Sequence, residues 1–131
     1  MAAYVIDASA AIELAAAGFS DPGSHRLLAP TLLRSQTLSI LHERVVAGQV
    51  AAVDAKRMLE LITALPVRLL GDRVLRGTAW KVADELGWAG TFDAEYVALT
   101  RLHGDALVTA DADFARRLDG VIPTVAPAIL L

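Results

Sequence analysis

The chain has 131 residues, in which 12 Lys and Arg against 15 Asp and Glu give a formal net charge of -3. This length predicts a single domain over residues 1–131, with enough chain to bury a core of its own. A hydrophobic content of 55% excludes a disordered chain, and the lack of cysteine excludes disulfides, zinc–thiolate sites and a thiol nucleophile. The acidic balance argues against a broad basic surface for nucleic acid.

The apolar start of the chain raises the question of a targeting segment. No Lys or Arg precedes the apolar run, and Asp7 and Glu13 interrupt it, so a signal peptide fits poorly. No uninterrupted apolar stretch approaches the roughly 20 residues of a membrane span. We therefore expect a soluble, cytoplasmic protein with no membrane partner.

Short apolar strands alternate with helices along the chain. The predicted strands, in chain order, cover residues 3–6, 26–29, 67–70 and 106–109, and the predicted helices cover 10–17, 31–46, 51–65, 72–86, 91–103 and 113–118. Ser9 and Asp72 are the expected N-caps of the first and fourth helices, and Gly18, Gly87 and Gly104 fall where helices end. The final apolar tail carries no predicted element. This order indicates an α/β fold with a parallel sheet and helices on both of its faces.

Four acidic residues fall near predicted strand ends or in the first turn of a helix. Asp7 directly follows the first strand, Asp93 lies in the first turn of the helix 91–103, and Asp111 and Asp113 follow the strand 106–109. In an open parallel sheet, ligands bind at the carboxyl ends of the strands. Several carboxylates in one place need a cation, and oxygen-only ligands suit Mg²⁺ or Mn²⁺. Such a site fits phosphoryl or phosphodiester chemistry.

Each of these acids also has an ordinary structural use. Asp7 fits a turn at a strand exit, Asp93 fits the positive end of a helix dipole, and Asp111 and Asp113 fit a pair of loop caps, with Asp113 starting the short helix. Asp93 shares a helix face with Tyr96, so we expect it to point inward. The joint placement of the four acids favours a functional site over four separate structural uses.

Gln36 is a polar residue on the apolar stripe of the helix 31–46. An unpaired polar group buried there would cost about 1–3 kcal/mol, so its side chain should have a partner. Two interpretations stay open: a core glutamine bonded to the backbone, or a side chain that reaches into the acidic site.

Three segments together resemble a PIN domain of the VapC type, the toxins of bacterial toxin–antitoxin pairs. They are Val5-Ile6-Asp7-Ala8-Ser9, the helix start Thr91-Phe92-Asp93-Ala94, and Leu107-Val108-Thr109-Ala110-Asp111-Ala112-Asp113. The resemblance covers nearly the whole chain in order and spacing. It implies a three-layer α/β/α sandwich with a mostly parallel sheet. It also implies a Mg²⁺- or Mn²⁺-dependent endoribonuclease that forms a homodimer and is inhibited by a cognate antitoxin.

The resemblance also implies roles for individual residues. Asp7 would be the central metal ligand, Asp93 and Asp111 would complete the metal site directly or through water, and Asp113 would be an auxiliary acid. The implied reaction is hydrolysis of an RNA phosphodiester by a metal-activated water, leaving a 5′-phosphate and a 3′-hydroxyl. Two further residues, Ser9 and Thr109, would orient the ligands through hydrogen bonds.

One position departs from the family's pattern. Relatives normally carry a glutamate six residues after a proline equivalent to Pro30, and this chain has Gln36 there. The amide keeps an oxygen but loses the charge, so metal binding and water activation should be weakened or abolished. Glu43 lies seven residues further, about 10.5 Å along a helix, which is too far to replace the missing carboxylate. Gln36 is therefore included in the candidate catalytic set.

Basic residues near the predicted site are few. Arg34 is close in sequence to Gln36, and Arg116 and Arg117 follow Asp113, so these three arginines are the candidates for contact with RNA phosphates. Solvated surface charge is the ordinary role for any one of them. The tryptophans Trp80 and Trp88 are expected to pack in the core or in an interface.

Two alternatives compete with the nuclease. The first is a PIN fold without catalysis that binds RNA or an antitoxin-like protein, with the apolar helices 10–17 and 51–65 forming the groove. The second is another α/β protein with an acidic cluster. A phosphatase of the haloacid dehalogenase type needs a second Asp where Ser9 stands, and a receiver domain needs a late lysine, whereas the chain has only Lys56 and Lys81.

Overall fold

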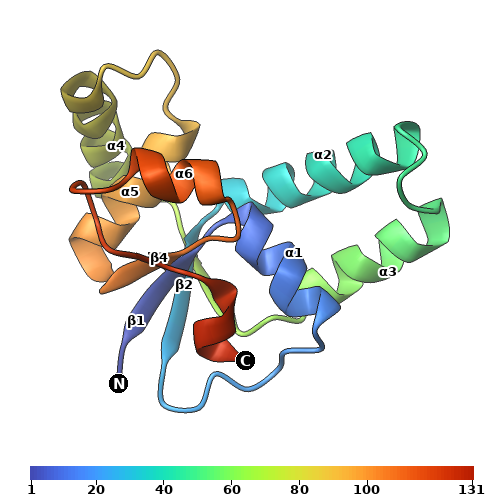
Figure 1. The fold of residues 1–131 in the computed structure, drawn as a ribbon. Coiled ribbons are helices and arrows are strands. Elements are labelled where there is room, and N and C mark those ends of the chain that lie inside the picture. Colours follow the sequence, from blue (N-terminus) through green and yellow to red (C-terminus); the bar gives the residue numbers. More distant parts are fainter.

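The structure, a computed structural model, describes all residues from 1 to 131 and is built on a five-stranded sheet (Figure 1). Its strands are β1 (Ala3–Ile6), β2 (Arg26–Pro30), β3 (Val67–Leu70), β4 (Ala106–Val108) and β5 (Thr124–Val125). All neighbouring strands are parallel, and their order is β3-β2-β1-β4-β5. The predicted parallel α/β sandwich is confirmed. The two-residue edge strand β5, in the tail without a predicted element, is too short to leave a sequence pattern.

The order of the strands creates a switch point between β1 and β4. The chain builds outward from β1 through β2 to β3, and then returns to add β4 and β5 on the other side of β1. Connections therefore leave β1 and β4 in opposite directions, and in open parallel sheets ligands bind at the carboxyl ends of the strands at such a point. Asp7 follows β1 directly, and Asp111 comes three residues after the end of β4.

Six α-helices and one 3₁₀ helix connect the strands. They are α1 (Ala8–Ala16), α2 (Leu32–Val46), α3 (Ala52–Thr63), α4 (Arg73–Leu86), α5 (Phe92–His103), α6 (Ala112–Arg117) and the 3₁₀ helix η1 (Pro127–Leu130). Every helix predicted from the sequence is present, with bounds that shift by up to two residues.

Two predicted helix starts are wrong. The N-cap of α1 is Asp7, whose side chain accepts from the backbone N–H of Ala10, and the predicted cap Ser9 lies inside the helix. Likewise Asp111 caps α6, while Asp113 lies in its first turn. In both cases an aspartate just before the first helical residue is in extended backbone, and its carboxylate accepts from free N–H groups at the start of the helix. Asp72 caps α4 as predicted.

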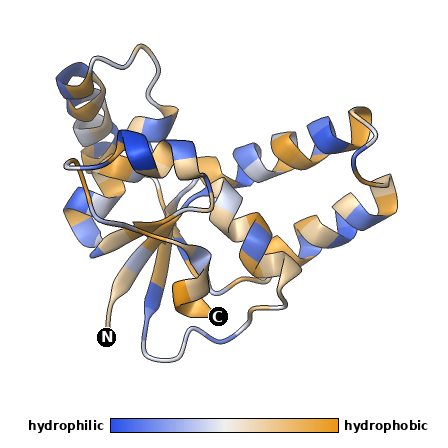
Figure 2. Ribbon diagram, in the orientation of Figure 1, coloured by the Kyte–Doolittle hydropathy of each residue, from blue (hydrophilic) through white to orange (hydrophobic).

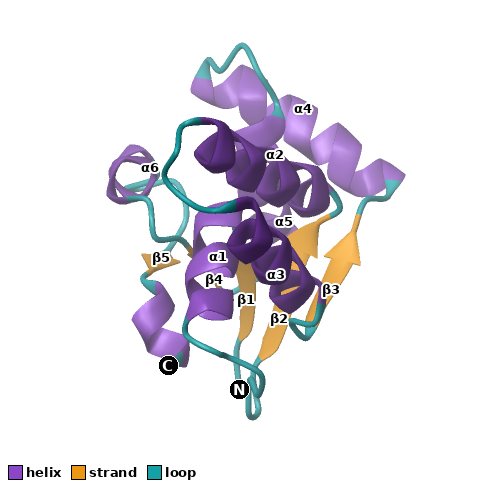
Figure 3. Cartoon of the chain, turned by 90° about the vertical axis from the view of Figure 1, so that its right-hand side faces the viewer, coloured by secondary structure: helices purple, strands orange, loops and turns teal.

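The sheet separates two apolar layers because alternate strand residues face opposite sides. Val5 and Leu107 pack with α4, α5 and α6, whereas Ile6 and Val108 pack with α1, α2 and α3. Figure 3 looks onto the face covered by α1, α2 and α3. The buried strands are among the most apolar parts of the ribbon in Figure 2.

Helices α2 and α3 form a hairpin that extends beyond the sheet (Figure 1). It exposes large apolar side chains, namely Leu38, Val46, Val53 and Leu61. A groove of about 460 Å³ lies between α2, α3 and β3. Helix α1 is mostly buried, so the proposal that it helps form an open partner groove is wrong. No helix combines the length and the apolar content that crossing a membrane requires.

Candidate active site

Asp7 sits at the centre of the candidate site, between the end of β1 and the start of α1. Its backbone N–H donates to the carbonyl of Val108 at 3.2 Å, which continues the pairing of β1 with β4. Only 7% of Asp7 is exposed. Its Oδ1 accepts from the Ser9 hydroxyl at 2.7 Å and from the Ala10 N–H at 2.9 Å, so both of these bonds fall on the same oxygen.

Burial raises the pKa of the Asp7 carboxyl above its ordinary value of 3.8. Hydrogen bonds from Thr109, Ala10 and Ser9 oppose this rise, and the negative charge of Asp111 adds to it. None of the three ion pairs in the structure includes Asp7. Asp7 is thus a buried acid whose charge lacks a cationic partner.

Ser9 and Thr109 join the two segments that carry the acids. Their hydroxyl oxygens lie 3.3 Å apart, within hydrogen-bond distance, and Ser9 also donates to Asp7. The N–H of Ala110 donates to Ser9 Oγ at 2.9 Å, and the N–H of Asp111 donates to Thr109 Oγ1 at 3.1 Å. This network fixes the loop after β4 against the start of α1.

Asp111 and Asp113 are both exposed and are used differently. Asp111 Oδ1 accepts from the N–H groups of Asp113 at 3.0 Å and Phe114 at 3.1 Å, which leaves its Oδ2 without a bond of this kind. The Asp113 carboxylate forms an ion pair with Arg116 within α6. Asp111 therefore combines capping with a position beside Asp7, whereas Asp113 is engaged by its own helix.

Asp93 is half-buried and faces Arg117, one of the three arginines predicted to contact RNA phosphates. Arg117 Nη2 lies 3.3 Å from Asp93 Oδ2. The guanidinium also stacks over the rings of Phe114, at 5.0 Å, and Trp88, at 5.8 Å. These contacts bridge α6 and the start of α5. No spacing in the sequence signals a pair between residues 24 positions apart.

Gln36 lies at the same edge of the sheet and is bonded to a tyrosine. The Tyr96 hydroxyl, on a side chain that is 2% exposed, donates to Gln36 Oε1 at 2.5 Å. Burial raises the Tyr96 pKa strongly, and the charges of Asp7, Glu95 and Asp93 raise it further, so this phenol stays protonated. Gln36 has a side-chain partner, and it lines a cavity of about 570 Å³ together with Asp93.

Other predicted residues lie elsewhere. Arg34 is exposed and lines the groove between α2 and α3. Glu43 is exposed and accepts from the Ser39 hydroxyl, away from the acids. Trp88 packs against the core, one of the two predicted roles, whereas Trp80 is 68% exposed, so of these roles only packing in an interface stays open for it.

One acid at this edge was not among the predicted site residues. Glu95 is half-buried on α5, and loss of solvent raises its pKa above the ordinary value of 4.5. Its position two residues after Asp93 would have been a signal in the sequence, but only the fold shows which surface it joins.

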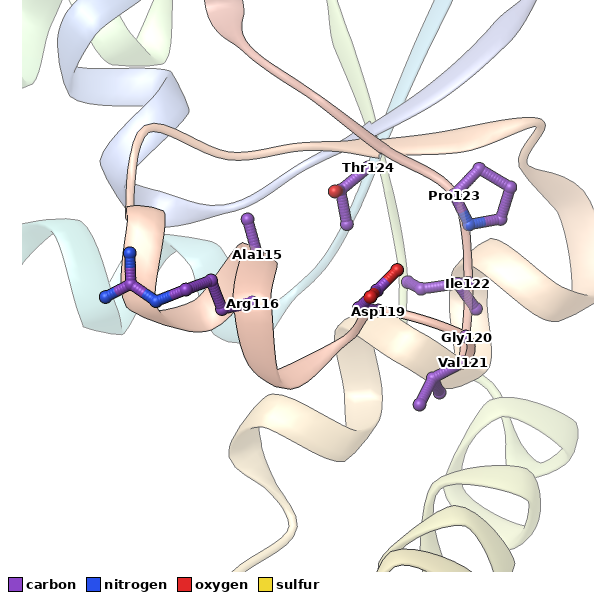
Figure 4. Close-up of a pocket in the computed structure, with 8 residues that line it drawn as sticks. All are labelled: Ala115, Arg116, Asp119, Gly120, Val121, Ile122, Pro123 and Thr124. Atoms are coloured by element: carbon purple, nitrogen blue, oxygen red, sulfur yellow. The ribbon is translucent and has the colours of Figure 1, made fainter.

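A more open cavity, of about 850 Å³, lies between α6 and β5 and is lined by Ala115, Arg116 and residues 119–124 (Figure 4). None of the candidate acids lines it. In Figure 4 the Arg116 side chain points away from the hollow, while Asp119 is its single acidic group. Its size alone does not make it the functional site.

The carboxylate oxygens of the candidate site suit a hard cation, although the carboxylates do not converge on a single point. No group of three or more His, Cys, Asp or Glu side chains is placed to hold a metal ion. The oxygens of Asp7, Asp93 and Asp111 nevertheless carry excess negative charge, and the buried member has no cationic partner. Mg²⁺ keeps several of its waters in proteins, so it can be held by carboxylates that are too far apart for direct ligation.

The comparisons with known proteins agree with this architecture. PAE2754 from Pyrobaculum aerophilum is 25% identical, with a TM-score of 0.74 over 98% of this chain and 93% of that chain. VapBC-1 from nontypeable Haemophilus influenzae is 17% identical, with a TM-score of 0.61 over 96% of this chain and 98% of that chain. This chain has a VapC-type PIN fold. No protein-family model matches the sequence, and no curated protein matches it closely enough to indicate a family.

The PIN fold explains why the candidate acids converge. It brings the segments after β1 and β4 and the start of α5 to the same edge of the sheet. Asp7 and Asp111 interact electrostatically there, and Asp93 and Asp7 both act on Tyr96. Three predicted residues lie outside this group: Asp113 and Arg116 pair with each other, and Arg34 lines the groove between α2 and α3.

Proposed function

We propose that the chain is a Mg²⁺- or Mn²⁺-dependent endoribonuclease toxin that hydrolyses RNA phosphodiester bonds. The observation that carries this proposal is the buried, uncompensated Asp7 carboxylate at the switch point of a VapC-type PIN fold. A buried charge without a partner is costly, and such groups gather at functional sites.

Asp7 would hold the ion through its carboxylate, and Asp93 and Asp111 would reach it directly or through water. A divalent ion bound there supplies an activated water and stabilises the leaving oxygen of the phosphodiester. Ser9 and Thr109 keep the Asp7 carboxylate in a fixed orientation through their hydrogen bonds. Arg117, now beside Asp93, would turn toward the RNA backbone when the ion neutralises that carboxylate.

Gln36 would weaken this activity. Its amide carries no charge, and its oxygen accepts a hydrogen bond from the Tyr96 hydroxyl. A glutamate in this position would add a negative charge to the edge and increase its attraction for a divalent cation. The chain would therefore need a higher metal concentration than a relative with the acid.

The partners proposed are an RNA substrate, a cognate antitoxin and a second copy of the chain, in the cytoplasm. The VapBC-1 neighbour supports the antitoxin. The exposed apolar residues of the α2–α3 hairpin offer surface for a protein partner.

A second candidate is a PIN-fold module that binds RNA or protein without cutting RNA. It is favoured by two observations: no three acids are placed to hold a metal, and the oxygen of Gln36 is already engaged by Tyr96. In this case the acids would be largely structural, as Asp111 is in its cap of α6.

Cleavage of a structured RNA in Mn²⁺ separates the two candidates. The chain should be compared with Gln36→Glu and with Asp7→Asn, each without and with EDTA. Metal-dependent cutting that increases in Gln36→Glu and disappears in Asp7→Asn supports the nuclease. Failure of both the chain and Gln36→Glu to cut would refute it and leave the binding module.

A further inference from the structure

A second cavity lies beside the candidate active site. Its volume is about 360 Å³, and its walls come from the start of α2, the β3–α4 turn, α4 and the first turn of α5. We name it the Glu95 cavity after the glutamate in its wall. Thr91 lines both this cavity and the one that holds Gln36 and Asp93, so the two are neighbours. Its volume is at the lower end of the about 300–1,000 Å³ of small-molecule sites.

The carboxylate of Glu95 has no partner in the structure. It is half-buried, yet none of the three ion pairs includes it, even though Arg76 lines the same cavity. The other acid of the cavity, Asp72, already accepts the Leu75 N–H at 2.8 Å as the cap of α4. A partly desolvated carboxylate without donors is unfavourable, and a ligand with N–H groups would satisfy it.

Helix α4 adds an aromatic ring and a positive charge to the same wall. Trp80 is 68% exposed, although tryptophan is usually among the well-buried side chains. Arg76 lies one helical turn before it, so the two side chains share a face of α4. Exposed aromatic rings stack on single-stranded bases, and arginine binds phosphate. The cavity therefore combines the three chemical features that recognise one nucleotide.

We propose that the Glu95 cavity is a subsite for a single unpaired guanosine of the RNA, with Glu95 accepting from the base, Trp80 stacking on it and Arg76 contacting an adjacent phosphate. The proposal rests on the proposed function, since it takes RNA as the ligand. Of the four RNA bases, guanine alone presents two neighbouring N–H donors on its Watson–Crick edge, N1–H and the 2-amino group. These match the two oxygens of a carboxylate, whereas uracil offers one such donor and adenine and cytosine offer a single amino group.

The subsite would give the chain a sequence preference near the cut. Because Thr91 separates the Glu95 cavity from the cavity of Gln36 and Asp93, a guanosine held here lies within the same stretch of RNA as the phosphate at the acidic edge. Adenine, cytosine and uracil would bind more weakly, because they leave the Glu95 carboxylate without one or both of its hydrogen-bond donors.

The test is the binding of labelled RNA to the full chain, without cleavage as a readout. Fluorescence anisotropy in EDTA at low salt would compare uridine hexamers that carry one central guanosine, inosine, adenosine or cytidine. We expect about tenfold tighter binding of the guanosine hexamer than of the adenosine and cytidine hexamers, with the inosine hexamer between them, as one bidentate contact to a base discriminates by about 5- to 150-fold. Inosine lacks the 2-amino group, so it tests the second hydrogen bond alone.

Variants assign the preference to the cavity. Glu95→Leu should reduce the guanosine preference to about twofold or less, because leucine removes both acceptor oxygens and has a similar size. Trp80→Ala should weaken all four hexamers by about tenfold, and Trp80→Phe should restore most of the binding. Glu60→Leu, at an exposed position of α3, is the matched control and should keep the full preference.

Equal binding of the four hexamers by the unaltered chain, or a preference that survives in Glu95→Leu, would overturn the subsite. So would a failure to bind any of them. The result is separate from that of the proposed function: a chain that prefers guanosine but never cuts RNA contradicts only the nuclease, and a chain that cuts without this preference contradicts only the subsite.

Discussion

Replacing Asp7 by asparagine is expected to stabilise the fold. The asparagine oxygen can still accept from the Ala10 N–H, and asparagine is as good an N-cap as aspartate. The substitution removes a charge that is buried, with 7% of the residue exposed, and that has no cationic partner. The loss of the charge also weakens the bond from Ser9 and the favourable interaction with the start of α1.

The gain should exceed the loss. Removing a buried charge eliminates a desolvation penalty of several kcal/mol. The weaker hydrogen bond and the lost helix-dipole interaction each destabilise the variant by about 0.5–1 kcal/mol. We therefore expect the free energy of unfolding to rise by about 1–2 kcal/mol, or about 3–7 °C in Tm for a chain of this size.

The pH dependence has a definite sign. The pKa of Asp7 is raised in the folded state, so the protonated form favours folding below 3.8, and this stability is lost as pH rises through the folded pKa. The stability difference between Asp7→Asn and the unaltered chain should thus be largest at neutral pH and should become smaller as pH falls toward 3.8. Mn²⁺ at 100 times its Kd should stabilise the unaltered chain by about 2.7 kcal/mol and Asp7→Asn by much less.

Urea denaturation from pH 4 to pH 8, followed by circular dichroism, measures these differences. Asp72→Asn is the matched control, because Asp72 is an exposed N-cap of α4 and its replacement should change stability by only a few tenths of a kcal/mol. A lower stability of Asp7→Asn at pH 7, or a difference that does not change with pH, would refute the reasoning.

Three further substitutions test other contacts. Tyr96→Phe removes the donor to Gln36 and should lower the free energy of unfolding by about 1 kcal/mol in urea, with an unchanged value arguing against the bond. Arg117→Met frees Asp93 from its ion pair and should reduce the Mn²⁺ concentration for half-maximal thermal stabilisation by up to about fivefold, whereas a higher requirement would show that the arginine assists the site. Gly104→Ala brings a methyl group within 2.9 Å of a valine of β1 and should cost about 1–3 kcal/mol, which a Tm measurement would detect or exclude.

Local patterns were sufficient to predict most of the fold. Helices and strands here follow from apolar periodicity and from glycines at helix ends, such as Gly87, whose φ of 69° lies in the left-handed region. The exception is β5, where two residues pair with β4 at the edge of the sheet and leave too short a pattern to recognise. Helix caps were misplaced by two residues because several polar residues near each start compete for the same N–H groups.

The pairings within the site could not be predicted in the same way. Tyr96 and Gln36 are 60 residues apart, and Arg117 and Asp93 are 24 apart, so no local spacing links them. The sequence showed that Gln36 needed a partner, since a polar group on an apolar stripe is costly alone. It offered no means of choosing between the backbone, an acid and a tyrosine.

By itself the sequence determined the α/β class, the positions of four of the five strands and the acids that follow them, because these depend on neighbours along the chain. The tertiary structure decided how deeply each acid is buried and what it contacts. Asp7 and Asp113 have the same carboxyl group, but one is enclosed at the switch point and the other faces Arg116 in solvent. Their electrostatic properties differ because solvation and charge pairing depend on residues that only folding brings close.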